Sequence, residues 1–348
     1  MKASEHLIRY TRTRDPLDLQ EYTNSGGFAG LRAALSMEQK EAVEEGKRAK
    51  LAGRGGAGVD AGFKWSTVPY EEESYVVCNA DEGEPGTFKD RFLMEHSPYL
   101  LIEGMVIAGY ATNSGKGYIY VRGEYPGVIR LLEQALARAR ENNLLGSNIL
   151  GSGFDFEVDV KRGGGSYVVG DETALLSSLM GNRGHPLFKP PYPTQEGLWS
   201  KPTLVNNVET LACVPLIFAQ GAAWFASIGN SSNPGPKLYP VSGHVRNPGV
   251  YEFPMGVGLE ELIDAAGGVS GTLKAVQIGG TAGPVYDRRA LSYTLDFLSM
   301  KEVGGTLGSG AVVVMNTSVN MAQVLQVTMR FFSEESCGQC FPCRYGTR

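Results

Sequence analysis

The sequence predicts an α/β domain with a mainly parallel sheet, followed by a small α+β domain of β-grasp type and a short helical segment. Apolar runs of strand type alternate with helical patterns in the first part of the chain, and this alternation is typical of a parallel sheet. A break rich in Pro, Gly, Ser and Asn at 230–237 indicates a linker. The pattern beyond the linker is strand, turn, strand, helix, strand, which indicates a second, smaller domain.

The elements of the first domain follow from hydrophobic periodicity. The charged amphipathic stretch 37–51 predicts a helix, which the glycine cluster 53–58 must end. After it we expect strands at 75–79, 117–122, 154–160 and 166–169, and helices at 98–111, at 127–142 and from about residue 173.

The same reasoning divides the remainder of the chain. Beyond the linker we expect strands at 238–245, 250–253, 274–278 and 284–286, with a turn at 247–249 and a helix at 259–266. A third segment adds a strand at 310–315 and a helix at 321–333. The predicted domains are therefore 1–230, 236–292 and 293–348.

Composition restricts the class of protein. The chain has 348 residues with a formal net charge of −5, and this mild acidity argues against a nucleic-acid partner. The longest apolar run, 99–111, is too short for a membrane span and contains Glu103. The first fifteen residues lack an apolar signal core, so we expect a cytoplasmic protein without a direct membrane span.

Four polar segments are candidate ligand sites. The loop 53–58 is rich in glycine, which lets backbone N–H groups approach an anion, and Arg54 and Lys64 supply positive charge at its ends. This loop is neither the dinucleotide fingerprint nor a Walker loop, and a flexible surface turn is its alternative. The acidic loop 79–86 follows a strand, where parallel sheets bind ligands, and its carboxylates suit hydroxyl groups; a solvated acidic loop is the alternative.

The other two polar segments lie at predicted helix starts. Asp171 and Glu172 follow the glycines 163–165, and Asn206 and Asn207 lie in the segment 201–210. These acids and amides could contact a ligand, or they could simply cap the helices that follow.

The cysteines point to metal chemistry. Cys337, Cys340 and Cys343 have the Cys-x2-Cys-x2-Cys spacing of iron–sulphur proteins, with zinc as the main rival. A fourth cysteine at the ferredoxin spacing is absent, because that position is Thr347. Cys78 and Cys213 are expected to pack as small hydrophobic residues.

Taken in order, the segments GRGGAG…KW, NADEGEPG, GDETAL, KPTLVNNVET, SGHVRNPGVYE and SCGQCFPCRYGT resemble one family. This is the flavin-bearing, NADH-oxidising F subunit of respiratory complex I, with its relatives in NAD-linked hydrogenases and formate dehydrogenases. The resemblance runs from Gly26 to the last residue. It implies a Rossmann-like FMN domain, a β-grasp (SLBB, soluble-ligand-binding) domain and the start of a helical domain that holds a [4Fe–4S] cluster.

The resemblance also implies roles for individual residues. Glu84 would position the nicotinamide, Glu172 would disfavour a 2′-phosphate, and no side chain is assigned as catalytic. The residues implied for NADH are Glu84, Glu172, Lys189 and Tyr192, and those implied for the cluster are Cys337, Cys340 and Cys343, with the fourth ligand not found in this chain. The residues implied for FMN are Gly53, Arg54, Gly55, Lys64, Asn79, Asp81, Glu82, Tyr167, Gly170, Asp171, Asn206, Asn207 and Thr210.

The implied activity is hydride transfer from NADH to FMN, followed by single-electron transfer through iron–sulphur clusters to partner subunits, including a thioredoxin-like [2Fe–2S] subunit. Contact with a membrane would come only through such partners. The alternatives are an NAD-reducing or electron-bifurcating subunit of a soluble hydrogenase or formate dehydrogenase, and an electron-transfer scaffold with a decayed nucleotide site. Val59, Asp60, Ala61 and Thr67 stand where the family carries Phe-Pro-Thr and another Phe, so we expect weaker stacking on the nucleotide.

Overall fold

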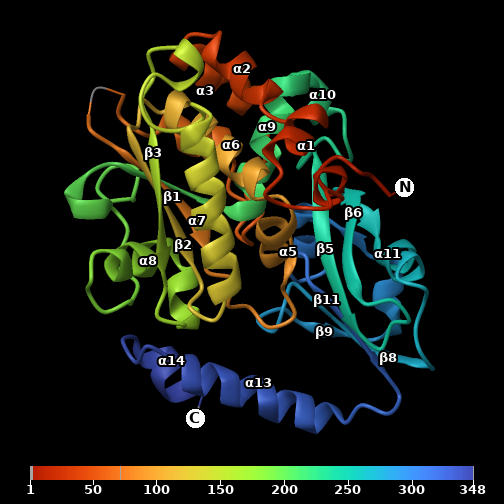
Figure 1. Cartoon of the computed structure of the whole chain (residues 1–348). Coiled ribbons are helices and arrows are strands. Elements are labelled where there is room, and N and C mark those ends of the chain that lie inside the picture. The colour runs from red at the N-terminus through yellow and green to blue at the C-terminus, as the bar shows by residue number, and fades with distance from the viewer. Residues whose placement is uncertain (1–2, 71, 348) are drawn as a thin grey trace.

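The computed structural model describes residues 3–70 and 72–347, and these residues form a four-stranded sheet, a five-stranded sheet and a separate two-stranded sheet (Figure 1). The first sheet has four strands in the order β3-β2-β1-β4, and all its neighbouring strands are parallel. Its strands are β1 (Tyr75–Ala80), β2 (Lys116–Val121), β3 (Glu157–Arg162) and β4 (Thr203–Asn207). This arrangement confirms the predicted parallel α/β domain.

Three helices pack tightly to form the main core of this domain: α2 (Ala29–Leu35), α6 (Pro98–Ala111) and α9 (Val208–Gln220). A Cβ atom at Gly104 would lie 2.0 Å from the carbonyl oxygen of Leu211, so only glycine allows α6 and α9 to approach this closely. The one carboxylate within the apolar helix α6 is stabilised by hydrogen bonds. Glu103 accepts hydrogen bonds from the Tyr22 hydroxyl and from the N–H groups of Phe28 and Leu31.

The other helices of the first domain surround this core and the sheet. They are α1 (Leu19–Asn24), α3 (Gln39–Arg48), α4 (Ala61–Ser66), α5 (Lys89–His96), α7 (Pro126–Glu141), α8 (Glu172–Leu179) and α10 (Ala222–Ala226).

Two strand predictions in this domain need correction. The strand expected at 154–160 is shifted to β3, and the strand expected at 166–169 is instead the 3-10 helix η3 (Tyr167–Gly170). The reason lies in the hydrogen bonds of η3. The Tyr167 N–H donates to the Glu335 carboxylate and not to a neighbouring strand, and the Gly170 carbonyl accepts from the Asn79 side chain.

The second sheet has the order β6-β5-β11-β8-β9. Its strands are β5 (Pro236–Gly243), β6 (Gly249–Pro254), β8 (Leu273–Ile278), β9 (Val285–Tyr286) and β11 (Val312–Asn316). The two-residue strands β7 (Val257–Gly258) and β10 (Thr294–Leu295) pair separately, and α11 (Leu259–Ala265) and α12 (Phe297–Glu302) complete the unit.

Strand β11 corrects the predicted boundary between residues 292 and 293. It lies at the centre of the second sheet, parallel to β5 and antiparallel to β8. Val312 and Val314 are buried in the same core as Tyr239 and Val276. The sheet therefore needs a strand that the sequence analysis assigned to the iron–sulphur segment.

The chain then runs into two helices, α13 (Met321–Glu335) and α14 (Phe341–Gly346), neither of which has a buried residue. Figure 1 shows them (dark blue) beside both domains, with α14 on the side of α8. No helix in the described part of the chain is long and apolar enough to cross a membrane.

Candidate functional site

The predicted site residues gather at the carboxyl ends of β1 and β4, where ligands bind in open parallel sheets. Asn79 of β1 lies directly opposite Asn207 of β4 in the strand register. The acidic loop therefore leaves the sheet next to the start of α9. Strand β2 ends on the other side of β1, and its neighbour Arg122 donates to the Glu82 carbonyl over 2.8 Å.

The glycine-rich loop closes over this edge of the sheet. The Gly53 N–H donates to the Val59 carbonyl over 2.8 Å, and the N–H of Arg54 donates to the Thr210 hydroxyl over 2.8 Å. A Cβ atom at Gly55 would lie 3.1 Å from Cβ of Asn207. The loop thus packs directly on the end of β4, where a side chain at Gly55 would have no room, and we call the loop 53–58 together with this end of β4 the cradle.

Arg54 itself is turned away from the loop. Its guanidinium is fully buried, and Nη2 donates to the carbonyl oxygens of Pro234 and Pro236 over 2.8 and 3.0 Å. Its other two nitrogens, Nε and Nη1, are buried without a hydrogen-bond partner, so a role of Arg54 in binding a phosphate stays a prediction. Arg54 binds the segment that joins the two domains, because that segment presents backbone acceptors that would otherwise be buried without partners.

Asp81 is the one predicted carboxylate that is buried and unpartnered. It is 7% exposed, and neither of its carboxylate oxygens accepts a hydrogen bond. Burial raises the pKa of Asp81 to about 7. The attraction of Arg122 lowers this pKa, and the repulsion of Glu124 and Glu335 adds a smaller increase. A buried acceptor without a hydrogen bond costs folding free energy, so a ligand hydroxyl that donates to Asp81 would remove this cost.

Two other predicted carboxylates have structural partners. The oxygens of Glu82 accept from the N–H groups of Asp90 and Arg91 over 2.8 and 2.9 Å, so Glu82 caps the start of α5, and its contact with FMN stays a prediction. One oxygen of Asp171 accepts hydrogen bonds from the N–H groups of Thr173 and Ala174, so Asp171 caps the start of α8. Capping was one of the two roles expected for this residue.

Glu172 lies between two lysines. Lys64 Nζ is 2.5 Å from one carboxylate oxygen and Lys189 Nζ is 2.7 Å from the other. Burial alone would raise the pKa of Glu172, but the two ammonium groups hold it below its usual range. Lys64 also donates to the carbonyl of Val205, so α4, β4 and α8 converge at this carboxylate.

Glu84 connects the two domains. One of its oxygens accepts from the Tyr167 hydroxyl over 2.5 Å, and the other accepts from the N–H of Ala282 over 2.8 Å. The Tyr167 ring packs edge-on against Phe331 of α13.

Tyr192 is 53% exposed on its loop, where its N–H donates to Gln195.

The amides at the end of β4 already have protein partners. Asn206 accepts from the indole N–H of Trp65 over 3.0 Å. Asn207 donates to Asp90 over 2.6 Å and accepts from Lys89 over 3.3 Å. The sequence analysis missed Lys89 and Asp90. Their position directly after the acidic loop was the available signal.

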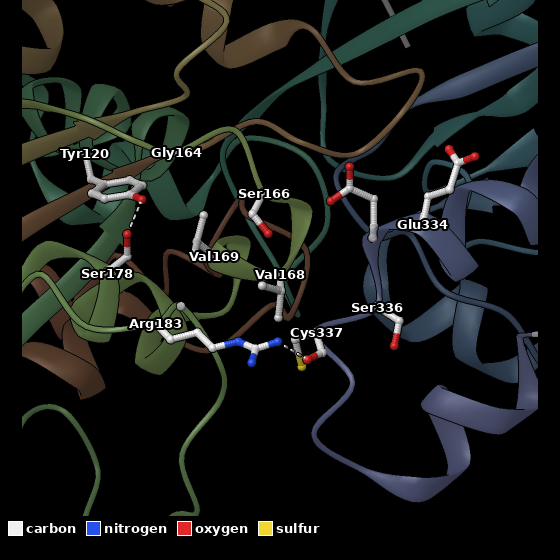
Figure 2. A pocket seen from close by; sticks show the side chains of 12 residues that line it. Tyr120, Gly164, Ser166, Val168, Val169, Ser178, Arg183, Glu334, Ser336 and Cys337 are labelled. Atoms are coloured by element: carbon white, nitrogen blue, oxygen red, sulfur yellow. Dashed lines mark hydrogen bonds between the residues drawn. The ribbon is translucent and has the colours of Figure 1, made fainter.

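The three cysteines are not brought together. Cys337 is half-buried, Cys340 and Cys343 are exposed, and the described residues contain no group of three His, Cys, Asp or Glu placed to hold a metal. Figure 2 shows Arg183 donating to the Cys337 carbonyl, over 2.9 Å, at a cavity of about 350 Å³. Three free thiols at this spacing suit an iron–sulphur cluster chemically.

Three segments of the chain match known protein families. Residues 47–216 match the family described as Nuo51 FMN-binding domain, and residues 238–286 match the SLBB domain. Residues 323–348 match the NADH-ubiquinone oxidoreductase-F iron-sulfur binding region.

Individual relatives agree with these matches. The chain is 49% identical to the NADH-quinone oxidoreductase F 2 subunit of Rhizobium meliloti (strain 1021), over 98% of this chain and 82% of that protein. It is 43% identical to HndC, a subunit of the NADP-reducing hydrogenase of Solidesulfovibrio fructosivorans, over 96% of this chain and 69% of that protein.

Among solved structures, the NAD+-reducing [NiFe]-hydrogenase in the H2-reduced state matches with a TM-score of 0.85 and 35% identity. The match covers 99% of this chain and 57% of the hydrogenase chain, so this chain spans little more than half of that one. With the parallel sheet, the glycine-rich cradle and the unpartnered Asp81 carboxylate, these matches show that the chain belongs to the family of NADH-quinone oxidoreductase F subunits.

Proposed function

We propose that this chain is the flavoprotein subunit of a multi-subunit NADH:acceptor oxidoreductase. It would take hydride from NADH onto FMN and pass single electrons through iron–sulphur clusters to partner subunits. The observation that carries the proposal is the buried Asp81 carboxylate, which directly follows β1 at the carboxyl end of the parallel sheet and has no hydrogen-bond partner. Bound FMN would supply the conversion between two-electron and one-electron chemistry.

The chain's own residues would bind and orient the ligands. The backbone around Gly53 and Gly55 allows a phosphate to approach closely, and Asp81 accepts hydrogen bonds from hydroxyl groups. Lys64 is held toward the site by Glu172 and the Val205 carbonyl, so its charge is fixed in place. The further FMN residues proposed from the family resemblance are Asn79, Tyr167, Gly170, Asn206 and Thr210.

Glu84, Glu172, Lys189 and Tyr192 are proposed for the nicotinamide nucleotide. Glu84 would exchange its bonds to Tyr167 and Ala282 for a bond to the ligand, so nucleotide binding would change a contact between the domains. The half-exposed Tyr192 ring is available for stacking. Cys337, Cys340 and Cys343 would hold the cluster.

The test is an anaerobic absorbance spectrum of the purified native complex, before and after NADH and then NADPH. Rapid loss of the flavin band with NADH alone supports the proposal and the role of Glu172. Bound flavin that neither nucleotide bleaches would refute it and would indicate a scaffold with a decayed nucleotide site.

A hydrogenase-type role is the second candidate, because the chain superimposes closely on the NAD+-reducing [NiFe]-hydrogenase. The same residues would serve transfer of electrons to NAD. Co-purification separates the two roles, since a hydrogenase subunit would identify the second. For either role we propose iron–sulphur partner subunits, including a thioredoxin-like [2Fe–2S] protein, and a cytoplasmic location with membrane contact only through partners.

A further inference from the structure

Four charged side chains form a buried network where the two domains meet. They are Lys89, Asp90 and Glu209 of the first domain and Lys237 of the second, and each is at most 5% exposed. Lys237 Nζ and Lys89 Nζ lie 2.8 and 2.9 Å from the same carboxylate oxygen of Glu209. Lys89 Nζ also lies 2.7 Å from Asp90. We call these four residues the interdomain network.

Lys237 is placed in this network by the second domain. It lies on β5, and the N–H of the next residue, Leu238, donates to the other oxygen of Glu209 over 2.7 Å. Gly310, which precedes β11, makes room for it, because a Cβ atom there would lie 2.9 Å from Cε of Lys237. The second domain therefore positions the ammonium group of Lys237 inside the first domain.

The interdomain network also reaches the glycine-rich loop. Asn207 bonds to both Lys89 and Asp90, and Gly55 packs against Asn207. Arg54 connects the same loop to the start of β5 through the carbonyl of Pro236, the residue before Lys237. Two connections thus run from β5 to the loop: one passes through the interdomain network and Asn207, and the other joins the Arg54 guanidinium to the Pro236 carbonyl.

We propose that Lys237 is a positioning residue for the FMN cradle, so that the SLBB domain is a structural part of the flavin site and not an appended module. This inference rests on the proposed function. With Lys237 present, Glu209 is balanced by two cations, and Lys89 can share its hydrogen bonds among Glu209, Asp90 and Asn207. Without Lys237, Lys89 would be the one ammonium group left within ion-pair distance of the buried Glu209, beside the Leu238 N–H and the attraction of Arg54, and a buried charge must remain paired. Asn207 would then lose an anchor, and the loop that packs on it would loosen.

The experiment uses the full chain in its complex, with Lys237→Met as the principal variant, because methionine keeps the volume and removes the charge. FMN affinity is measured by the quenching of free FMN fluorescence when it binds the flavin-stripped protein. Loss of one buried charged hydrogen bond is expected to weaken FMN binding about tenfold. Lys237→Arg should restore most of the affinity. The matched control is Lys274→Met, which removes an exposed lysine on β8 of the same domain.

Hydrogen exchange of the flavin-free protein gives a readout that does not need FMN. In Lys237→Met, amides of residues 53–58 should exchange faster, while those of β8 and β11 should not change. Unchanged FMN affinity together with unchanged exchange at 53–58 would overturn the proposal, as would faster exchange throughout the second sheet, which indicates general destabilisation. If the wild-type protein binds no FMN, the proposed function fails, and loop exchange alone then decides whether Lys237 positions the loop.

Discussion

The Asp81 carboxylate should make the stability of the flavin-free protein fall as pH rises. Its folded-state pKa of about 7 lies well above its ordinary value of 3.8, because burial favours the neutral form. Below pH 3.8 the residue is neutral in both folded and unfolded chains. As pH rises toward 7 the unfolded chain ionises first, so the folded state progressively loses stability relative to it.

The size of the effect follows from these two pKa values. Between pH 5 and pH 8, Asp81 should remove about 2.5 kcal/mol of folding free energy. Asp81→Asn cannot ionise and should not show this loss. The variant should therefore gain about 2.5 kcal/mol relative to wild type over the same interval, whatever its stability at pH 5.

The assay is urea unfolding of flavin-free wild type and Asp81→Asn at pH 5, 6, 7 and 8. Taking the difference between the two proteins at each pH removes the contributions of other titrating groups, including Glu82, whose pKa burial raises to about 8. A wild-type–variant difference that stays constant from pH 5 to pH 8 would refute the reasoning. Asp81→Asn should also bind FMN more weakly, since a carboxylate acceptor is lost.

Three further predictions concern other parts of the molecule. Gly235→Ala should destabilise the protein by about 3 kcal/mol, since its Cβ would lie 2.1 Å from the Phe225 ring; thermal unfolding checks this against Gly151→Ala, which has a similar positive φ and open space. Glu172→Gln should narrow the preference for NADH over NADPH about tenfold. The substitution removes the negative charge that would repel the 2′-phosphate of NADPH and leaves Lys64 and Lys189 without their carboxylate. Steady-state kinetics with both nucleotides test that change, and an unaltered ratio contradicts it. Cys340→Ser should lower the iron content while the FMN content stays the same, as elemental and flavin analysis of the purified complex would show; a full iron content would remove Cys340 from the ligand set.

Much of the fold could be predicted because local patterns determine it. Helix α6 has the bounds expected from its apolar run, and its proline start and the turn that ends it are both visible in the sequence. Strands β1 and β2 follow from short apolar runs between helices, β3 begins three residues after its expected start, and β4 was not expected. The misassigned element, η3, is a short apolar run of the same kind, and its conformation depends on Glu335, which is far away in the sequence.

In the candidate site, too, some features follow from local sequence and others depend on distant residues. Glycine clusters and acids after a strand predict a site at the carboxyl ends of the strands, because glycine and carboxylates have strong local preferences and parallel strands place their ends together. Whether each acid faces a ligand could not be decided in this way. Glu82 and Asp81 are adjacent, yet one caps α5 and the other is unpartnered.

The sequence alone therefore determined the class of domain, the position of the cradle and the family to which the chain is similar. Only the tertiary structure decided that Arg54 binds the junction between domains, that β11 completes the second sheet and that Lys237 neutralises Glu209. The physical reason is that a buried charge or strand edge must find its partner to offset the cost of leaving water. That partner can lie anywhere in the chain, so no local pattern contains it.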